Sequence, residues 1–206
     1  MNFTSKISNR FIAALLCAVL YPSLASPHFP IPPKQPSEIG RRIVKTTVPD
    51  FNLTDQNGDM FRFRRTRGKL VVVTFIFTAC PDVCPLLTAK LAAIQRALEE
   101  KKFADYRLLS ITTDPEADSA AKLKSYAGLF KADLSRWSFL TGAPAQLAKV
   151  WKAFGVNVTK TDAGQVFHTG LTTLIDRHGN RRVDYYGEKW LEKEVLKDLQ
   201  WLGGQK

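Results

Sequence analysis

Sulfur and imidazole side chains are scarce in this chain, which has three cysteines, three histidines and two methionines among 206 residues. A closed structural zinc site needs four ligands, more than the cysteines supply. The sequence also lacks an uninterrupted apolar run of about 20 residues, the length that spans a bilayer as a helix. It has no internal repeat. The composition, with 45% hydrophobic and 24% charged residues, suits one globular domain with flanking segments.

The beginning of the chain has the layout of a secretory signal peptide. Lys6 and Arg10 precede a short apolar run at residues 11–21, and no acid lies among them. The small side chains of Ser23 and Ala25 predict cleavage after Ala25. The alternative is that this segment stays uncut as an anchor. We therefore expect an exported protein in the periplasm of a bacterium, attached to the inner membrane if the anchor is kept.

Cleavage would change both the thiol content and the charge. Cys17 would leave with the leader, so the mature chain would keep two cysteines. The formal charge would fall from +11 to +9, because the leader carries two basic residues and no acid. A basic protein favours acidic partners or an anionic membrane surface through long-range attraction. We expect no nucleic-acid partner, since the protein is exported and no basic run is interleaved with aromatic residues.

Two segments come before the main part of the chain. Residues 26–44 include the proline-dense sequence SPHFPIPPKQP, which favours an extended backbone, and we interpret them as a linker. Residues 49–63 have alternating apolar stretches on both sides of Asn57-Gly58, a pair suited to a tight turn. We therefore expect an N-terminal β-hairpin within a domain that covers residues 45–206.

The remaining patterns alternate between strands and helices. Residues 70–77, LVVVTFIF, form a β-branched and aromatic run, typical of a strand that is covered on both faces. Further strands are expected at residues 106–112, 137–140, 171–176 and 182–186. Helices are expected from about 83–85 to 100, and at 117–129, 144–154 and 190–202. This order predicts an α/β fold, a thioredoxin-like sandwich with a central mixed sheet flanked by helices.

The two cysteines of the mature chain, Cys80 and Cys84, lie four residues apart where the predicted central strand gives way to its helix. Ligands of open α/β sheets gather at the carboxyl ends of strands, and N–H groups at a helix start favour a thiolate. The pair is close enough to share a metal ion or to form a disulfide. A purely structural disulfide is less favoured, because so short a loop stabilises the fold by only about 2 kcal/mol.

A metal ion shared by these cysteines would need another donor, and few histidines are available. His28 lies in the proline-dense linker and His178 in a predicted turn, where solvated imidazoles need no functional explanation. His168 precedes the penultimate strand, on a loop able to face the cysteine loop, although position alone does not make it a ligand. Two thiolates and an imidazole form a soft site that suits copper(I) and, through its nitrogen, also accepts copper(II).

Three aspartates accompany the cysteines in the sequence. Asp82 lies between them, and Asp114 and Asp118 belong to the segment DPEAD. Each is a candidate for tuning the site or facing a partner. The simpler alternative is that they are solvated loop or helix-capping residues.

The sequence FTACPDVCP at residues 77–85, followed by TDPE at 113–116 and later by His168, resembles the Sco/SenC family. The likeness spans about residues 45–202. Members of that family are thioredoxin-like proteins, usually tethered to a membrane, that bind copper through two cysteines and a histidine. The resemblance implies that both cysteines and His168 are copper ligands here. It also implies a role in assembling the dinuclear copper centre of cytochrome c oxidase subunit II, or in serving another exported copper protein.

The residues beside the histidine depart from the family pattern. Phe167 and Thr169 stand where the family often has an acidic residue and a serine. Outer hydrogen bonds orient imidazole ligands, so we expect the groups around His168 to differ from those of other members.

The favoured hypothesis is a copper metallochaperone, which binds metal rather than turning over a substrate. The alternative is an enzyme, a thiol-disulfide oxidoreductase that cycles Cys80 and Cys84 to reduce the cysteines of an exported client. Three residues instead of two separate these cysteines, and the last proline, Pro144, lies well before the penultimate strand. General disulfide exchange is therefore less favoured than reduction of one client. A copper-responsive regulator or antioxidant with the same site is a third alternative.

Overall fold

A computed structural model of the protein describes residues 40–204. The expected leader, its cleavage site and residues 26–39 of the expected linker, with His28, lie outside the described residues. Within the described part, no helix combines the length and the apolar character needed to cross a bilayer.

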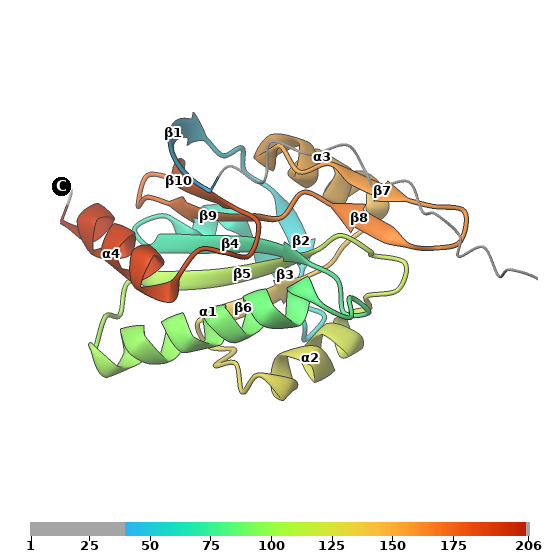
Figure 1. The fold of residues 1–206 in the computed structure, drawn as a ribbon, viewed down its shortest axis with the longest axis horizontal. Coiled ribbons are helices and arrows are strands. Elements are labelled where there is room, and N and C mark those ends of the chain that lie inside the picture. The colour runs from blue at the N-terminus through green and yellow to red at the C-terminus, as the bar shows by residue number, and fades with distance from the viewer. Residues whose placement is uncertain (1–39, 205–206) are drawn as a thin grey trace, which may run out of the picture. The chain divides into compact units, whose positions relative to one another are not determined.

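The centre of the domain is a six-stranded mixed sheet with the order β1-β10-β9-β4-β5-β6 (Figure 1). Its parallel half consists of β4 (Leu70–Ile76), β5 (Tyr106–Thr112) and β6 (Trp137–Leu140). Its antiparallel half consists of β9 (Leu171–Ile175), β10 (Asn180–Tyr186) and β1 (Arg41–Thr47). Every residue of β4 is buried, as its unbroken apolar sequence predicts.

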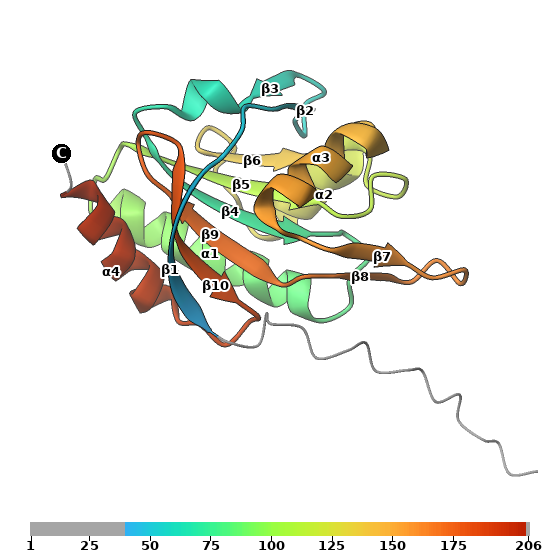
Figure 2. The same cartoon turned by 90° about the horizontal axis from the view of Figure 1, so that it is seen from above.

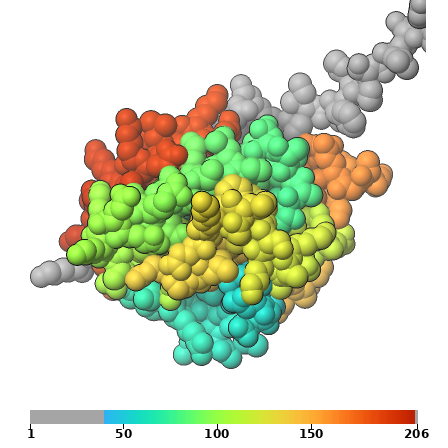
Figure 3. All heavy atoms as spheres, turned by 90° about the horizontal axis from the view of Figure 1, so that it is seen from below, coloured from blue at the N-terminus to red at the C-terminus, as the bar shows by residue number. Residues whose placement is uncertain are grey.

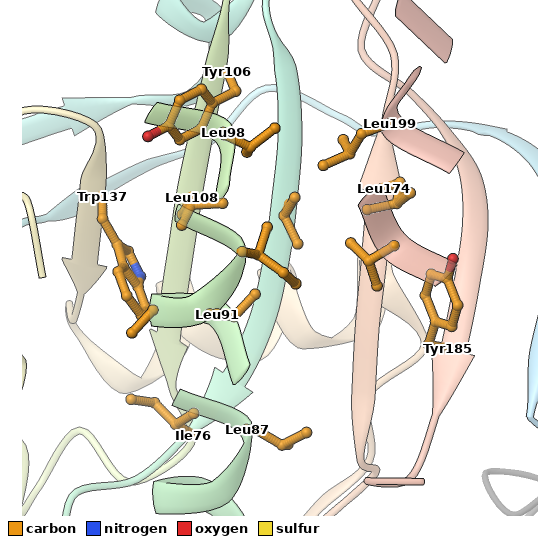
Figure 4. Close-up of a cluster of buried hydrophobic side chains, with 14 of the residues drawn as sticks. Ile76, Leu87, Leu91, Leu98, Tyr106, Leu108, Trp137, Leu174, Tyr185 and Leu199 are labelled. Atoms are coloured by element: carbon orange, nitrogen blue, oxygen red, sulfur yellow. The ribbon is translucent and has the colours of Figure 1, made fainter. Parts of the chain in front are cut away.

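The α-helices of the described residues are α1 (Val83–Glu100), α2 (Ala120–Leu129), α3 (Pro144–Phe154) and α4 (Glu192–Gly203). Buried side chains of α1, α2 and α4 pack on one face of the sheet, and those of α3 pack on the other (Figures 1 and 2). Figure 4 shows the first cluster, in which Leu91 of α1 and Leu199 of α4 join Leu174 of β9. Figure 3 shows α1 in green and α2 in yellow on the outer surface of this face. The α/β thioredoxin-like sandwich is thus confirmed.

Two β-hairpins lie outside the central sheet. The first pairs β2 (Asn52–Thr54) with β3 (Met60–Arg62) and is followed by a short 3-10 helix, η2 (Phe63–Thr66). Gly58 has a φ of 87° in its turn, a conformation that explains a glycine after Asn57. The second hairpin pairs β7 (Val158–Lys160) with β8 (Val166–His168) and extends from the domain beside α3 (Figure 2).

The structure differs from the sequence-based expectation chiefly at three places, besides shifts of two residues at the starts of β10 and α4. A strand, β1, begins at Arg41, within the segment interpreted as a linker to residue 44. Helix α2 begins at Ala120, not 117, because Ser119 caps it by accepting a hydrogen bond from the N–H of Lys122. The β7–β8 hairpin was not expected, since its strands are only three residues long and carry a weak alternating pattern.

Candidate functional site

The cysteines lie at the carboxyl end of β4, where the chain turns into α1. The N–H of Cys80 donates to the carbonyl of Phe77 at 3.2 Å, which closes the turn after the strand. Pro85 lies in the first turn of α1, where the helix needs no N–H from it. Cys84 in that turn is buried and Cys80 is half-buried. Strand and helix together fix both sulfur atoms at one edge of the sheet.

The two cysteines are free thiols with very different proton affinities. A hydrogen bond from Cys84 and the backbone N–H groups of the helix start lower the pKa of Cys80 to about 6, against the opposing effect of burial. One of these N–H groups, that of Cys84, lies 3.4 Å from Cys80 Sγ. The same sulfur-sulfur hydrogen bond, together with burial, raises the pKa of Cys84. At neutral pH, Cys80 is therefore a thiolate that accepts a hydrogen bond from the Cys84 thiol.

The third candidate ligand, His168, reaches the cysteines from the β7–β8 hairpin. It is the last residue of β8 and pairs with Val158. Its Nε2 lies 3.9 Å from Cys84 Sγ, and its ring packs edge-on against Phe77, with centroids 5.9 Å apart. The structure thus brings together the cysteine loop and a histidine that lies 84 residues beyond Cys84 in the sequence.

The hydrogen bonding of His168 determines which nitrogen is available. Nδ1 lies 3.0 Å from the backbone carbonyl of Thr169, which can only accept, so Nδ1 carries the proton. Nε2 then presents its lone pair toward Cys84. Burial lowers the pKa of His168, which favours this neutral form. A backbone carbonyl orients the imidazole here, so an acidic residue in the position of Phe167 is not needed for that purpose.

This arrangement fits a soft metal ion in part. A sulfur and a nitrogen 3.9 Å apart can both reach one ion at bond lengths of about 2.3 and 2.0 Å, with an angle of about 130° between the two bonds. However, no group of three or more His, Cys, Asp or Glu side chains among residues 40–204 is close enough to hold a metal ion as it stands. Cys84 and His168 already face each other, so a three-donor site that includes Cys80 needs a local rearrangement.

The predicted aspartates take three different positions. Asp118 is fully buried, and its carboxylate accepts hydrogen bonds from the N–H of Thr78 at 3.1 and 3.2 Å and from its hydroxyl at 2.5 Å. It also accepts one from the hydroxyl of Thr112 at 2.6 Å. Asp118 is thus neither solvated nor a helix cap, and it ties the cysteine loop to the end of β5. Asp114 is buried beside a lysine, and Asp82 is exposed at the N-cap of α1, where its side chain makes no capping bond.

Two features of the site were missed from the sequence. One is the hairpin that carries His168, and the other is Lys160 on that hairpin, whose ammonium contacts Asp114 and Glu116. A signal for the hairpin was present in Gly164, which has a φ of 79° between the two strands. The other described histidine, His178, is exposed in the β9–β10 turn, in accordance with the expectation.

Comparisons with known proteins place the sequence and the fold of this chain beside those of one family. Residues 41–203 match the model of the SCO1/SenC family. The SCO1 protein homolog of Bacillus subtilis is 30% identical over 157 residues, which cover 74% of this chain and 81% of that protein. The structure of a SCO1/SenC family lipoprotein from Bacillus anthracis is similar with a TM-score of 0.73 and 31% identity, covering 79% of this chain and 98% of that one. ScoI of Bradyrhizobium japonicum, solved with copper bound, has a TM-score of 0.66 and 32% identity, covering 76% of this chain and 99% of that one.

Proposed function

The chain belongs to the SCO1/SenC family, and on that premise we propose that it is a copper metallochaperone whose ligands are Cys80, Cys84 and His168. The observation that carries this proposal is the placement of His168, whose proton-free Nε2 faces Cys84 Sγ at 3.9 Å. A proton-free imidazole nitrogen beside a thiol that can ionise is a pair of donors that one metal ion can take up together.

The chemistry of the donors favours copper as the cargo. Two sulfur atoms suit copper(I), and the imidazole nitrogen adds a donor for copper(II). Uptake of the ion would release the proton that Cys80 and Cys84 share, so metal binding and thiol ionisation are coupled. The carbonyl of Thr169 would hold the imidazole in its metal-binding tautomer throughout. The copper-bound structure of a relative, ScoI of Bradyrhizobium japonicum, supports the same assignment.

We propose that the client is a copper protein outside the cytoplasm, namely cytochrome c oxidase subunit II, and that the copper is delivered to its dinuclear centre. A similar solved structure, BsSco, is described as a member of the Sco family of cytochrome c oxidase assembly proteins. The leader-like sequence at residues 1–25 and the lipoprotein relative support an exported, membrane-attached protein, in the periplasm of a bacterium.

The test is a copper titration of the reduced protein beside His168→Ala, with free thiols counted before and after. Wild type should bind close to one equivalent of copper, and the copper(II) absorption bands should shift or vanish in the variant. His178→Ala is the matched control, since it removes an exposed imidazole from the β9–β10 turn, at the opposite end of β9 from His168, and its spectrum should match wild type. Failure of wild type to bind copper, or a His168→Ala spectrum identical to wild type, would refute the proposal.

A second function is favoured by the thiol pair itself. The pKa of Cys80 near 6 makes it a nucleophile at neutral pH, and Cys84 keeps a proton beside it. The Cys80 thiolate would attack a client disulfide and form a mixed disulfide, and Cys84 would then displace the client. The client leaves with two thiols, and Cys80 and Cys84 are oxidised to a disulfide. Client reduction that is undiminished in His168→Ala would identify this activity as independent of the copper site.

A further inference from the structure

The hairpin that carries His168 has a second contact with the domain, through Lys160. Its Nζ lies 2.6 Å from Glu116 Oε2 and 3.1 Å from Asp114 Oδ1. Both carboxylates belong to the loop between β5 and α2, 44 and 46 residues before the lysine. One ammonium group thus bridges two acids on an element that is distant in the sequence.

The pairing of the hairpin strands puts Lys160 and His168 on the same face. His168 pairs with Val158, and Lys160 pairs with Val166. Residues directly opposite each other in an antiparallel ladder share a face, and so do residues two apart on one strand. The hairpin therefore presents both polar side chains to the domain, with His168 near its base and Lys160 nearer its tip.

The loop that receives Lys160 also holds the cysteines. The N–H of Asp114 donates to the hydroxyl of Thr112 at 2.9 Å, and this hydroxyl donates to Asp118. Asp118 in turn accepts the N–H and hydroxyl of Thr78, two residues before Cys80. The two parts of the candidate copper site, the cysteine loop and the histidine hairpin, are thus fastened to one loop.

We propose that Lys160 is a positioning residue, a latch that holds the β7–β8 hairpin on the β5–α2 loop and keeps His168 facing Cys84. Its consequence for copper rests on the proposed function, whereas its effect on the hairpin does not. In this scheme Asp114 and Glu116 contact no metal and act only as acceptors for the latch.

The strength of the latch follows from the exposure of its members. The side chain of Lys160 is 38% exposed and that of Glu116 is 70% exposed, so their contact is largely screened by water. Asp114 is only 9% exposed, which makes its contact with Lys160 the stronger one. Hydrogen bonds to Glu116 and Asp114 raise the pKa of Lys160, and that of Glu116 is lowered by the lysine. Loss of the ammonium should therefore loosen the hairpin by a factor of roughly 1.5 to 5.

The experiment compares Lys160→Gln and Lys160→Arg with Lys124→Gln, which removes the same charge from an exposed position in α2. Hydrogen exchange of the amides in residues 158–168 is measured in the reduced, metal-free protein. Copper(II) affinity and the copper(II) spectrum are measured on the same samples, at about 0.1 and 1 M salt. Urea unfolding checks that each variant is folded.

We expect Lys160→Gln to raise hairpin exchange and to lower copper(II) affinity, each roughly 1.5- to fivefold, with a weaker His168-dependent band in the spectrum. Lys160→Arg and Lys124→Gln should behave as wild type. The difference between wild type and Lys160→Gln should shrink at 1 M salt, where the screening length is about 3 Å.

Two results separate the latch from the proposed function. If wild type binds copper through His168 but Lys160→Gln changes neither hairpin exchange nor affinity, the latch is wrong and the proposed function stands. If Lys160→Gln raises hairpin exchange but wild type binds no copper, the latch stands and the proposed function fails.

Discussion

Asp118 offers a sharp test of how the cysteine loop is held. The structure assigns its buried carboxylate three donors: the N–H and hydroxyl of Thr78 and the hydroxyl of Thr112. Asp118→Asn keeps the volume but removes the charge and replaces one acceptor oxygen by a donor. At least one charge-assisted hydrogen bond is then lost inside the protein, which costs about 1.5 to 3 kcal/mol. We therefore expect the free energy of unfolding to fall by about 2 kcal/mol.

The assay is urea unfolding of the reduced, metal-free protein, followed by fluorescence of its tryptophans, of which Trp137 and Trp190 are buried. The dependence of the free energy on urea should stay unchanged, because the variant exposes no extra surface on unfolding. Asp162→Asn is the control, since Asp162 is exposed in the β7–β8 turn and its replacement should change stability by less than about 0.5 kcal/mol. An Asp118→Asn variant as stable as this control would refute the assigned role.

Three further predictions concern the core, the thiols and acid stability. Leu91→Ala removes a fully buried side chain from α1 and should destabilise the protein by about 2 to 5 kcal/mol in the same urea assay, whereas a loss below about 1 kcal/mol would contradict the packing described. In metal-free protein, the alkylation rate of Cys80, followed by mass spectrometry, should rise with pH to a plateau, with a midpoint near the Cys80 pKa of about 6. A midpoint near 9.0, the ordinary pKa of a cysteine, would contradict the assigned hydrogen bonds. Burial opposes ionisation of Asp198, yet hydrogen bonds from Arg41 and Tyr185 bring its pKa below the ordinary 3.8. The ionised Asp198 therefore stabilises the fold fully above pH 3.8, and this contribution is lost as pH falls through the lower pKa of the folded state. Asp198→Asn should flatten the loss of stability below about pH 5 in acid titrations. An unchanged profile would exclude this contribution.

Local patterns were sufficient to predict the sheet and helices that hold the cysteines. Strand β4 is apolar throughout because both of its faces are buried, so its sequence identifies it without knowledge of its neighbours. The position of Pro85 restricted the start of α1, because proline fits only the first turn. Since Cys80 follows β4 and Cys84 lies at the start of α1, the sequence predicted both at the junction of strand and helix, where the structure has them.

The contacts that complete the site depend on residues far apart in the chain, so the sequence did not reveal them. Strands of three residues, such as β7 and β8, give too short a pattern to identify, and His168 was accordingly expected on a loop. Lys160 looks like any surface lysine until the fold brings Asp114 to it. The edge strand β1 was missed for a similar reason. Its sequence is exposed and basic, which is not typical of a strand. The strand is held by contacts with residues late in the chain, including the guanidinium of Arg41, which donates to both carboxylate oxygens of Asp198 at 2.7 and 2.8 Å.

X-ray absorption spectroscopy of the copper-loaded, reduced protein tests the central claim most directly, because it counts the atoms bound to the metal. We predict two sulfur donors and one imidazole nitrogen in wild type, and loss of the nitrogen alone in His168→Ala. Coordination by sulfur only in wild type, or a nitrogen donor that persists in His168→Ala, would contradict the account.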